Sequence, residues 1–158
     1  MKLLVLCALI GAAVAATTTP WQGETELTQG SHDFQTEMSE CSNSGRYLYF
    51  KDAKHWADAQ LHCQTLGGTL AVIHTSQEND LLKNLAKGMP AWIGFSDAQH
   101  EGIWLWINGD RLSYTDWCYA EPDNVGGKQD CAIINSTGNK CWDDQDCKTA
   151  FPFICQMK

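Results

Sequence analysis

The sequence predicts an α+β domain in which two helices are followed by a series of short strands. Two segments between residues 55 and 88 carry apolar residues at helical spacing, and several apolar runs of strand length come after them. A stretch rich in cysteine and carboxylate residues, from Trp117 to Cys147, lies among the later strands. Helices early in the chain and strands late in it favour α+β over an alternating α/β fold.

Residues 1–16 have the composition of a signal peptide. Lys2 supplies a positive charge, residues 3–14 form an apolar core, and Ala13-Val14-Ala15 is a small-residue cleavage site. The apolar run is too short to span a bilayer. We therefore expect a soluble, secreted protein in a compartment where disulfides persist.

Residues 17–40 are rich in Thr, Gln, Glu, Ser and Gly, which predicts a flexible N-terminal leader. We expect the folded domain to span residues 41–158. Removal of the signal peptide would change the formal net charge from −8 to −9 and the number of cysteines from eight to seven. The negative charge excludes nucleic acid and an anionic membrane surface as partners and is compatible with a divalent cation. The odd cysteine count leaves one thiol that is free or pairs with another chain.

The first strand is predicted at residues 46–50 and the first helix at residues 55–66, with Gly67-Gly68 ending the helix. A second strand is predicted at residues 69–74. The apolar residues of the helix at helical spacing are Trp56, Ala59, Cys63 and Leu66.

The second helix is expected to begin with the capping box Thr75-Ser76-Gln77-Glu78, in which the threonine caps the first turn and the glutamate reaches back. It continues to Gly88. From there on the pattern is that of strands: residues 103–107 and 111–114 flank Asn108-Gly109, a strong signal for a hairpin turn. The other strands are predicted at residues 91–95, 131–134 and 151–156.

The stretch from Trp117 to Cys147 contains four cysteines, a proline between two carboxylates, and a second pair of carboxylates. It is too long for a mere connection, which favours a function. Ca²⁺ takes six to eight oxygen ligands, and carboxylate and amide oxygens on disulfide-linked loops can supply them. We therefore predict a calcium site that is also a sugar site.

Several segments together resemble a C-type lectin-like domain over residues 41–158. Within that family, Thr115-Asp-Trp-Cys118 and Lys140-Cys-Trp-Asp-Asp144 resemble the fish lectins, including those that became type II antifreeze proteins. The matching segments are Cys63-Gln-Thr-Leu-Gly-Gly-Thr-Leu-Ala71, Trp92-Ile-Gly-Phe95, Glu121-Pro-Asp123, Cys131, Cys141-Trp-Asp-Asp144, Cys147 and Cys155.

The resemblance implies two helices with short antiparallel sheets and a long loop that carries the calcium site. It also implies the disulfides Cys63–Cys155, Cys118–Cys141 and Cys131–Cys147. Cys41 is left over, and we predict an interchain Cys41–Cys41 disulfide that makes a homodimer. The alternative is a free or cysteinylated thiol.

The resemblance further implies a ligand set for Ca²⁺ and a cis peptide bond before Pro122. The set includes the backbone carbonyl of Asp144. The ligand side chains carried over by motif are Glu121, Asp123, Gln129, Asp143 and Asp144.

The Glu-Pro-Asp motif differs from both familiar versions, since Glu-Pro-Asn lectins favour mannose-type sugars and Gln-Pro-Asp lectins favour galactose. In relatives each coordinated sugar hydroxyl donates to a carboxylate and accepts from an amide, and of the five ligand side chains only Gln129 carries an amide donor. We therefore add Asn124 and Lys128 to the predicted sugar-binding residues. Asp123 favours galactose or lactose.

We predict a carbohydrate-binding lectin that agglutinates cells or microbes in innate defence. One alternative is an ice-binding protein like the type II antifreezes, although the charged loop argues against a flat, weakly hydrated surface. The other is a protein-binding module of the same fold whose metal and sugar site has decayed. Fold similarity by itself does not choose among ligands.

No arrangement typical of an enzyme stands out, so we expect no catalytic activity. His55 and His62 lie seven residues apart on one helix without a third ligand, which indicates surface histidines rather than a zinc site. Asn135-Ser136-Thr137 is a sequon for N-glycosylation, used or unused. Packing roles are predicted for Trp92, Trp104, Trp106, Trp117 and Trp142.

Overall fold

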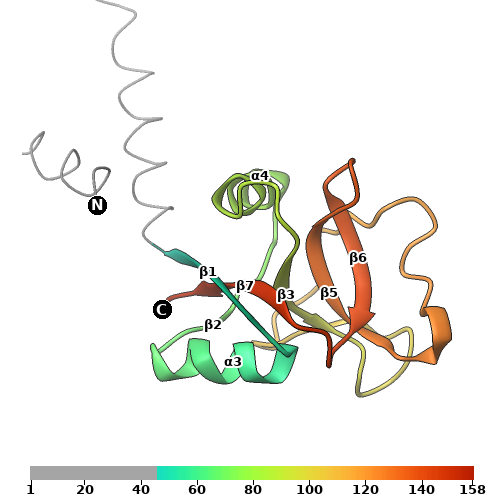
Figure 1. The fold of residues 1–158 in the computed structure, drawn as a ribbon, viewed down its shortest axis with the longest axis horizontal. Coiled ribbons are helices and arrows are strands. Elements are labelled where there is room, and N and C mark those ends of the chain that lie inside the picture. Colours follow the sequence, from blue (N-terminus) through green and yellow to red (C-terminus); the bar gives the residue numbers. More distant parts are fainter. Residues whose placement is uncertain (1–45) are drawn as a thin grey trace, which may run out of the picture. The chain divides into compact units, whose positions relative to one another are not determined.

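The computed structural model describes residues 46–158, and Figure 1 shows its elements in chain order. The predicted signal peptide, the predicted leader and Cys41 lie outside the described residues. The elements are β1 (Tyr47–Lys54), α3 (Trp56–Thr65), β2 (Thr69–Leu70), α4 (Ser76–Leu85), β3 (Ala91–Ser96), β4 (Leu105–Trp106), η2 (Val125–Gly127), β5 (Gln129–Ser136), β6 (Cys141–Asp146) and β7 (Phe151–Gln156).

The strands form one sheet in the order β1-β7-β3-β5-β6, with β2 added to β7 and β4 added to β3. All pairs are antiparallel except β3 and β7, which run parallel. The helices α3 and α4 lie on opposite sides of the strands β1, β7 and β3 (Figure 1). The α+β prediction is confirmed, with the strands joined in one sheet in which a single pair, β3 and β7, is parallel.

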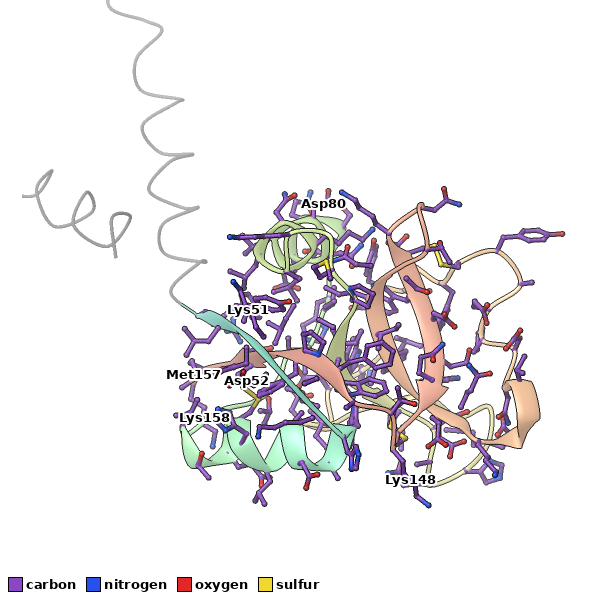
Figure 2. All side chains as sticks on the ribbon, in the orientation of Figure 1. Lys51, Asp52, Asp80, Lys148, Met157 and Lys158 are labelled. Carbon is purple, nitrogen blue, oxygen red and sulfur yellow. A yellow bond between two sulfur atoms is a disulfide. The ribbon has the colours of Figure 1, made fainter. Side chains whose placement is uncertain are left out.

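Each helix covers its own hydrophobic cluster. Leu82 and Ala86 at the α4 side pack with Ile93, Ile134 and other residues of the larger cluster. On the α3 side, the smaller cluster includes Ala59, Cys63, Leu70, Trp92 and Phe153. The exposed face of α4 is polar, as Asp80 illustrates (Figure 2), whereas α3 exposes Leu61, which is 60% accessible.

The helix α3 ends where the sequence predicts, at Gly67-Gly68. The N–H of Gly68 donates to the Cys63 carbonyl at 2.9 Å, and Gly67 has a φ of +83°, a backbone conformation that favours glycine. A Cβ atom at Gly68 would lie 2.2 Å from the Gln156 carbonyl oxygen. The turn therefore requires both glycines, one for its φ and one for the close approach of β7.

The capping box of α4 differs slightly from the expectation. The Thr75 hydroxyl accepts from the Glu78 N–H at 3.2 Å, as predicted. Glu78, however, accepts from the N–H of His74 at 2.7 Å, one residue before the cap. Its carboxylate therefore fixes the chain that enters the helix rather than the cap residue itself.

The predicted hairpin at residues 103–114 is wrong. Leu105 and Trp106 pair with β3, and the turn at Asn108-Gly109 forms, with the Gly109 N–H donating to the Trp106 carbonyl at 2.9 Å. Residues 111–114 form no strand, because they pack against α4 instead. The Ser113 hydroxyl donates to the His74 carbonyl at 3.2 Å, and the Tyr114 hydroxyl accepts from Asn79 on α4 at 3.1 Å.

Two other strand predictions need correction. The strand predicted at residues 69–74 is regular only at Thr69–Leu70. The strand β6, with the sequence CWDDQD, was not predicted, because its run of polar residues lacks the alternation of a half-buried strand. Its pairing with β5 gives the acidic stretch a rigid base.

Four of the predicted packing tryptophans form an aromatic cluster around Phe95, namely Trp104, Trp106, Trp117 and Trp142. Trp92 packs in the cluster on the α3 side, against Phe151. Trp92 and Trp142 are fully buried, Trp106 is buried, and Trp104 and Trp117 pack against the core while partly exposed. Phe95 stacks on Trp106 with ring centroids 4.2 Å apart, and Trp142 lies edge-on to Trp106 at 5.9 Å. One member of this cluster, Trp142, lies on β6, two residues before Asp144.

Candidate functional site

The loop that precedes β5 is attached to the strand β6. The N–H of Cys118 donates to the Trp142 carbonyl at 2.8 Å, and the N–H of Trp142 donates to the Asp116 carbonyl at 2.7 Å. A disulfide joins Cys118 to Cys141. The start of the loop therefore has a fixed position beside β6, and the residues that follow, Ala120 to Asn124, pass over this strand.

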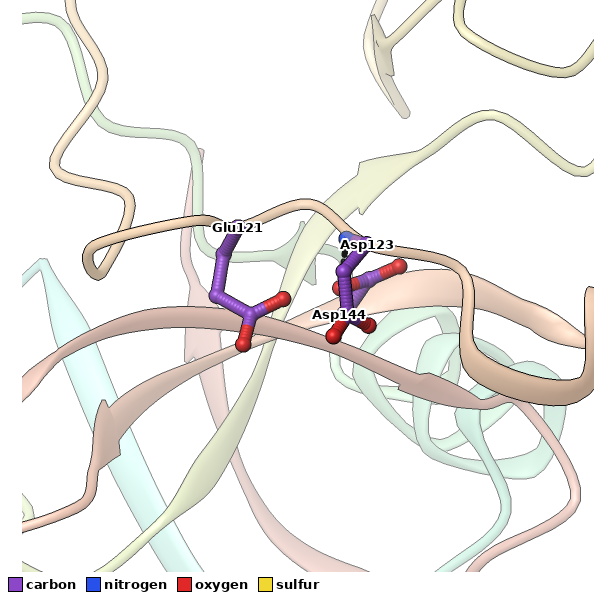
Figure 3. Close-up of side chains that lie close together, drawn as sticks. All are labelled: Glu121, Asp123 and Asp144. Atoms are coloured by element: carbon purple, nitrogen blue, oxygen red, sulfur yellow. Dashed lines mark hydrogen bonds between the residues drawn. The ribbon is translucent and has the colours of Figure 1, made fainter.

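Three carboxylates meet where the loop crosses β6. Glu121 and Asp123 come from the loop on either side of Pro122, and Asp144 comes from β6 (Figure 3). One carboxylate oxygen from each lies within 4.8 Å of the others. The Glu121–Pro122 peptide bond is cis. We call these three residues the carboxylate cluster.

Asp144 is the fully buried member of the carboxylate cluster. Its side chain is inaccessible to solvent, and its two oxygens accept from the N–H groups of Asp123, at 3.2 Å, and Asn124, at 2.8 Å. Two charge-assisted hydrogen bonds hold the loop onto the strand. They leave the remaining lone pairs of the carboxylate directed at other ligands.

Glu121 is the residue of the cluster whose pKa is shifted by its surroundings. Its pKa is raised to about 7, first by burial and then by the charge of Asp143, a hydrogen bond to Asp144 and the charge of Asp123. Its Oε2 atom is buried and has no hydrogen-bond partner among the described residues. Buried carboxylate oxygens without a donor are suited to a cation, so the cluster fits a divalent metal ion.

Gln129, at the start of β5, lies next to the cluster through the Asp144 backbone. Its Nε2 donates to the Asp144 carbonyl at 2.6 Å, while its Oε1 is buried without a partner among the described residues. The amide oxygen is therefore free to act as a ligand. The amide nitrogen donates to the Asp144 carbonyl, which is itself part of the predicted ligand set.

Asp143 lies on β6 beside Asp144 but is not one of the three clustered carboxylates. It accepts hydrogen bonds from the Ser136 hydroxyl at 2.7 Å and from Gln145 Nε2 at 3.1 Å. Its charge still acts on Glu121. The structure thus brings together Glu121, Asp123 and Asp144, and leaves Asp143 at the margin.

Asn124 and Lys128, the two predicted sugar donors, differ in availability. Asn124 has a left-handed backbone with a φ of 45°, its Nδ2 donates to Glu101, and its Oδ1 accepts from the Gln129 N–H at 3.0 Å. Lys128 follows η2 and is exposed. The ammonium of Lys128 is thus the more accessible donor.

Glu101 was not predicted to take part, and no local pattern around it indicates a role. It is positioned by Asp97, a buried residue whose Oδ2 accepts from the Gly102 N–H at 2.8 Å. Burial, as the largest cause, raises the pKa of Asp97. Asp97 therefore holds the turn that presents Glu101 to Asn124.

The structure has disulfides between the three pairs of cysteines that the resemblance implies. Cys63–Cys155 connects α3 to β7, and Cys131–Cys147 connects β5 to the residue after β6. Cys118–Cys141 joins the long loop to β6. Two of the three bridges therefore flank the carboxylate cluster.

The predicted N-glycosylation of Asn135 does not fit the folded domain. Asn135 is 2% exposed, and its Nδ2, the atom that a glycan would modify, donates to the carbonyls of Lys83 at 3.3 Å and Met89 at 3.1 Å. Its backbone φ of 59° lies within β5, where the register with β6 shifts between Ile133 and Ser136. The side chain of the sequon asparagine is therefore used in packing against α4.

His55 and His62 do not form part of a metal site. His62 packs between the rings of Phe50, at 4.7 Å, and Phe153, at 5.3 Å, and His55 lies 3.5 Å from Asp58. Over residues 46–158, the carboxylate cluster is the one group of three or more metal-ligating side chains close enough to share an ion. Over the same range, no helix has the length and apolar character to cross a membrane.

Comparisons with known proteins match both the fold and the site segments. The family model described as "Lectin C-type domain" matches residues 52–157. The lactose-binding lectin l-2 of Anguilla japonica is 43% identical over 119 residues, covering 71% of this chain and 71% of that protein. The type-2 ice-structuring protein of Osmerus mordax is 34% identical over 162 residues, covering 95% of this chain and 90% of that protein.

Among solved structures, herring type II antifreeze protein superposes with a TM-score of 0.66 at 35% identity. The superposition covers 71% of this chain and 91% of the herring protein. Lectins and ice-structuring proteins are therefore both among the relatives.

Proposed function

Because the chain belongs to the C-type lectin domain family, we propose that it is a secreted, calcium-dependent lectin for galactose-type sugars. The matched family model covers residues 52–157, and a relative is named for lactose binding. The observation that carries the proposal is the carboxylate cluster, in which Glu121 Oε2 is buried without a donor among the described residues. An uncompensated group of carboxylates of this kind gains most from a bound dication.

The proposed calcium ligands divide into two groups. Glu121, Asp123 and Asp144 already converge, and Gln129 contributes Oε1. The Asp143 carboxylate is expected to join them by a small side-chain shift, and the Asp144 backbone carbonyl, which accepts from Gln129 Nε2, completes the proposed set. Bound Ca²⁺ would supply coordination for sugar hydroxyl oxygens, while the carboxylates accept the hydroxyl hydrogens.

The predicted hydrogen-bond donors to the sugar differ in whether they are free. Gln129 Nε2 donates to the Asp144 carbonyl and Asn124 Nδ2 to Glu101, so neither is available without rearrangement. Lys128 is exposed and can donate to a sugar oxygen at the rim. We propose a galactose-type ligand because Asp123 occupies the third position of the motif. Lys128 is the proposed secondary contact, and Asn124 joins it once its hydrogen bond to Glu101 is released.

We also propose that the protein acts as a Cys41-linked homodimer that agglutinates cells or microbes in innate defence. Single-sugar sites on a protein surface bind weakly, and two sites in one molecule gain from a high effective concentration for the second contact. The proposal includes the signal peptide at residues 1–16, the leader at residues 17–40 and the domain at residues 41–158. It includes no catalytic activity.

The proposal is tested by retention of the purified protein on lactose-agarose and mannose-agarose, each with Ca²⁺ and with EDTA. We expect retention on lactose that EDTA releases. Asp144→Asn should abolish retention, whereas Asp80→Asn, on the exposed face of α4, should not. Retention that survives EDTA would overturn the calcium requirement, and no retention on either column would overturn the lectin assignment.

A second function, ice binding, is favoured by the ice-structuring relatives. It predicts thermal hysteresis at millimolar protein, with activity lost on substitutions in the loop around Asp123. The thermal hysteresis measurement separates the two proposals, because a lectin of this kind is not expected to lower the freezing point. A protein that fails both assays would be a protein-binding module of the same fold.

A further inference from the structure

The strand β1 has a free edge. It pairs with β7 on one side, and among residues 46–158 no other strand pairs with it. Unpaired strand edges bind other strands unless they are short, kinked or covered. The half of β1 from Tyr47 to Phe50 contains neither proline nor glycine nor charge, and its register with β7 is regular.

The opposite edge of the sheet is covered. There, the loop segment Asp116 to Cys118 lies along β6 and exchanges backbone hydrogen bonds with Trp142. Within residues 46–158, β1 is therefore the edge that no other segment pairs with.

The hydrogen-bond phase shows which backbone groups face the free edge. The Met157 N–H donates to the Arg46 carbonyl at 2.7 Å, and Leu48 and Phe50 lie two and four residues further along the same register. In an antiparallel ladder, bonded pairs alternate with non-bonded ones. The N–H and C=O groups of Tyr47 and Tyr49 therefore point away from β7, toward solvent.

We propose that this edge pairs with the β1 edge of a second copy, in an antiparallel arrangement whose two-fold axis passes at Tyr49. The inference deepens the proposed dimer by giving it a noncovalent interface. With the axis there, the outward-pointing groups of Tyr49 meet those of its own copy, and Tyr47 faces Lys51, the first residue beyond the regular part of the β1–β7 register. An axis one residue away would place outward groups in a different set of pairs.

The side chains select this register. It places the exposed Leu48, 41% accessible, opposite the half-buried Phe50 of the second copy in a non-bonded pair, where side chains approach most closely. It also places Arg46 opposite Asp52, one ion pair on each side of the axis. Lys51 and Asp52 extend from β1 in Figure 2.

The neighbouring symmetric registers fit less well. An axis at Phe50 would place Arg46 opposite Lys54, two like charges, and Leu48 opposite the charged Asp52. An axis at Leu48 would leave Arg46 opposite the apolar Phe50. Only the axis at Tyr49 joins opposite charges and apolar side chains at once.

The proposed Cys41 disulfide can span this interface. Four residues lie between Cys41 and Arg46, so an extended chain would cover about 16 Å over the five steps from one to the other. The two Arg46 residues would be about 20 Å apart, because each lies three residues from the axis at about 3.3 Å per residue. Two such segments reach across with slack, and the tether raises the effective concentration of a weak interface.

The interface is tested in a Cys41→Ser background by sedimentation equilibrium, which measures the noncovalent dimer alone. We expect Arg46→Glu and Asp52→Lys each to weaken dimerisation about tenfold, because each variant faces two like charges across the axis. The double variant should return to within about threefold of the parent, since it restores both pairs with exchanged signs. Asp80→Lys, an equal charge change on α4, should have no effect.

Disulfide trapping provides a second measurement in the same background. Leu48→Cys with Phe50→Cys should cross-link the two copies on oxidation, because non-bonded pairs have Cα atoms about 4.5 Å apart, within the range of a disulfide. Leu48→Cys alone should not, because the position does not face itself. A monomer at all concentrations, or a double charge variant that fails to recover, would overturn the interface, whereas retention on lactose by the same monomer would leave the lectin proposal intact.

Discussion

At the scale of single residues, Glu121 shows how the carboxylate cluster changes the protonation of one of its members. Its pKa of about 7 lies above the ordinary value of 4.5, chiefly because of burial and the charge of Asp143. Between these two pH values the folded protein binds a proton that the unfolded chain has lost. Without calcium, the stability that this group contributes is therefore complete below pH 4.5 and is lost as the pH rises through 7.

This pH dependence gives the first prediction. In EDTA, raising the pH from 5 to 8 should lower the unfolding temperature of the wild-type protein by several degrees more than that of Glu121→Gln, which cannot acquire the charge. With Ca²⁺ at pH 8, the wild-type protein should unfold at a higher temperature than Glu121→Gln, because the ionised carboxylate then has a partner. Thermal denaturation at both pH values checks this, with Asp80→Asn as the control. Parallel pH profiles for wild type and Glu121→Gln would contradict it.

At the scale of elements, the helix α4 is joined to the site through Asn79. This residue is 1% exposed, its Oδ1 accepts from Trp142 Nε1 at 2.8 Å, and its Nδ2 donates to Tyr114 and to Asp116 at 2.8 Å. Lys83, one turn further along, forms an ion pair with Asp116. One helix thus orients both the start of the long loop and the strand β6.

Asn79→Ala is therefore expected to destabilise the fold by about 2–3 kcal/mol, because it leaves the buried Trp142 N–H without an acceptor. Urea denaturation measures the change, with Asn84→Ala, at an exposed position of the same helix, as the control. The calcium affinity should fall as well, since Asp116 and Trp142 hold the loop against β6. An Asn79→Ala protein as stable as wild type would refute this role.

The helices were predictable from sequence because local signals determine them. Thr75 supplies a cap, and Gly67 supplies the conformation that ends α3. β6 was not predictable, because its polar residues are stabilised by pairing with β5 and by bonds such as Ser136 to Asp143, which are remote in sequence. The hairpin prediction failed for the same reason: residues 111–114 find better partners on α4 than on residues 103–107.

The candidate site was predictable as a set of residues and not as an arrangement. The motif indicates Glu121, Asp123 and Asp144, which the structure brings together. It does not show that the side-chain amides of Gln129 and Asn124 donate to groups of the protein itself. Their acceptors, the Asp144 carbonyl and Glu101, are brought to the site only by the tertiary fold.

At the scale of the whole molecule, the proposed function requires two sites in one particle. Cys41→Ser should retain binding to lactose, because Cys41 lies far along the chain from the carboxylate cluster. It should lose agglutination of cells at protein concentrations too dilute for the noncovalent dimer. Agglutination titres with a lactose-column control check this, and unchanged agglutination by a protein that runs as a monomer would contradict the dimer.

The order of strands in the sheet determines what such a dimer does at a surface. The edge strand β1 and the strand β6 that carries Asp144 lie at opposite ends of the path β1-β7-β3-β5-β6. Joining two copies at β1 would direct their sites outward, away from each other. The dimer would then be a bridge between two particles rather than a clamp on one. Its activity should consequently pass through an optimum, because an excess of lectin coats every particle and leaves none to be bridged.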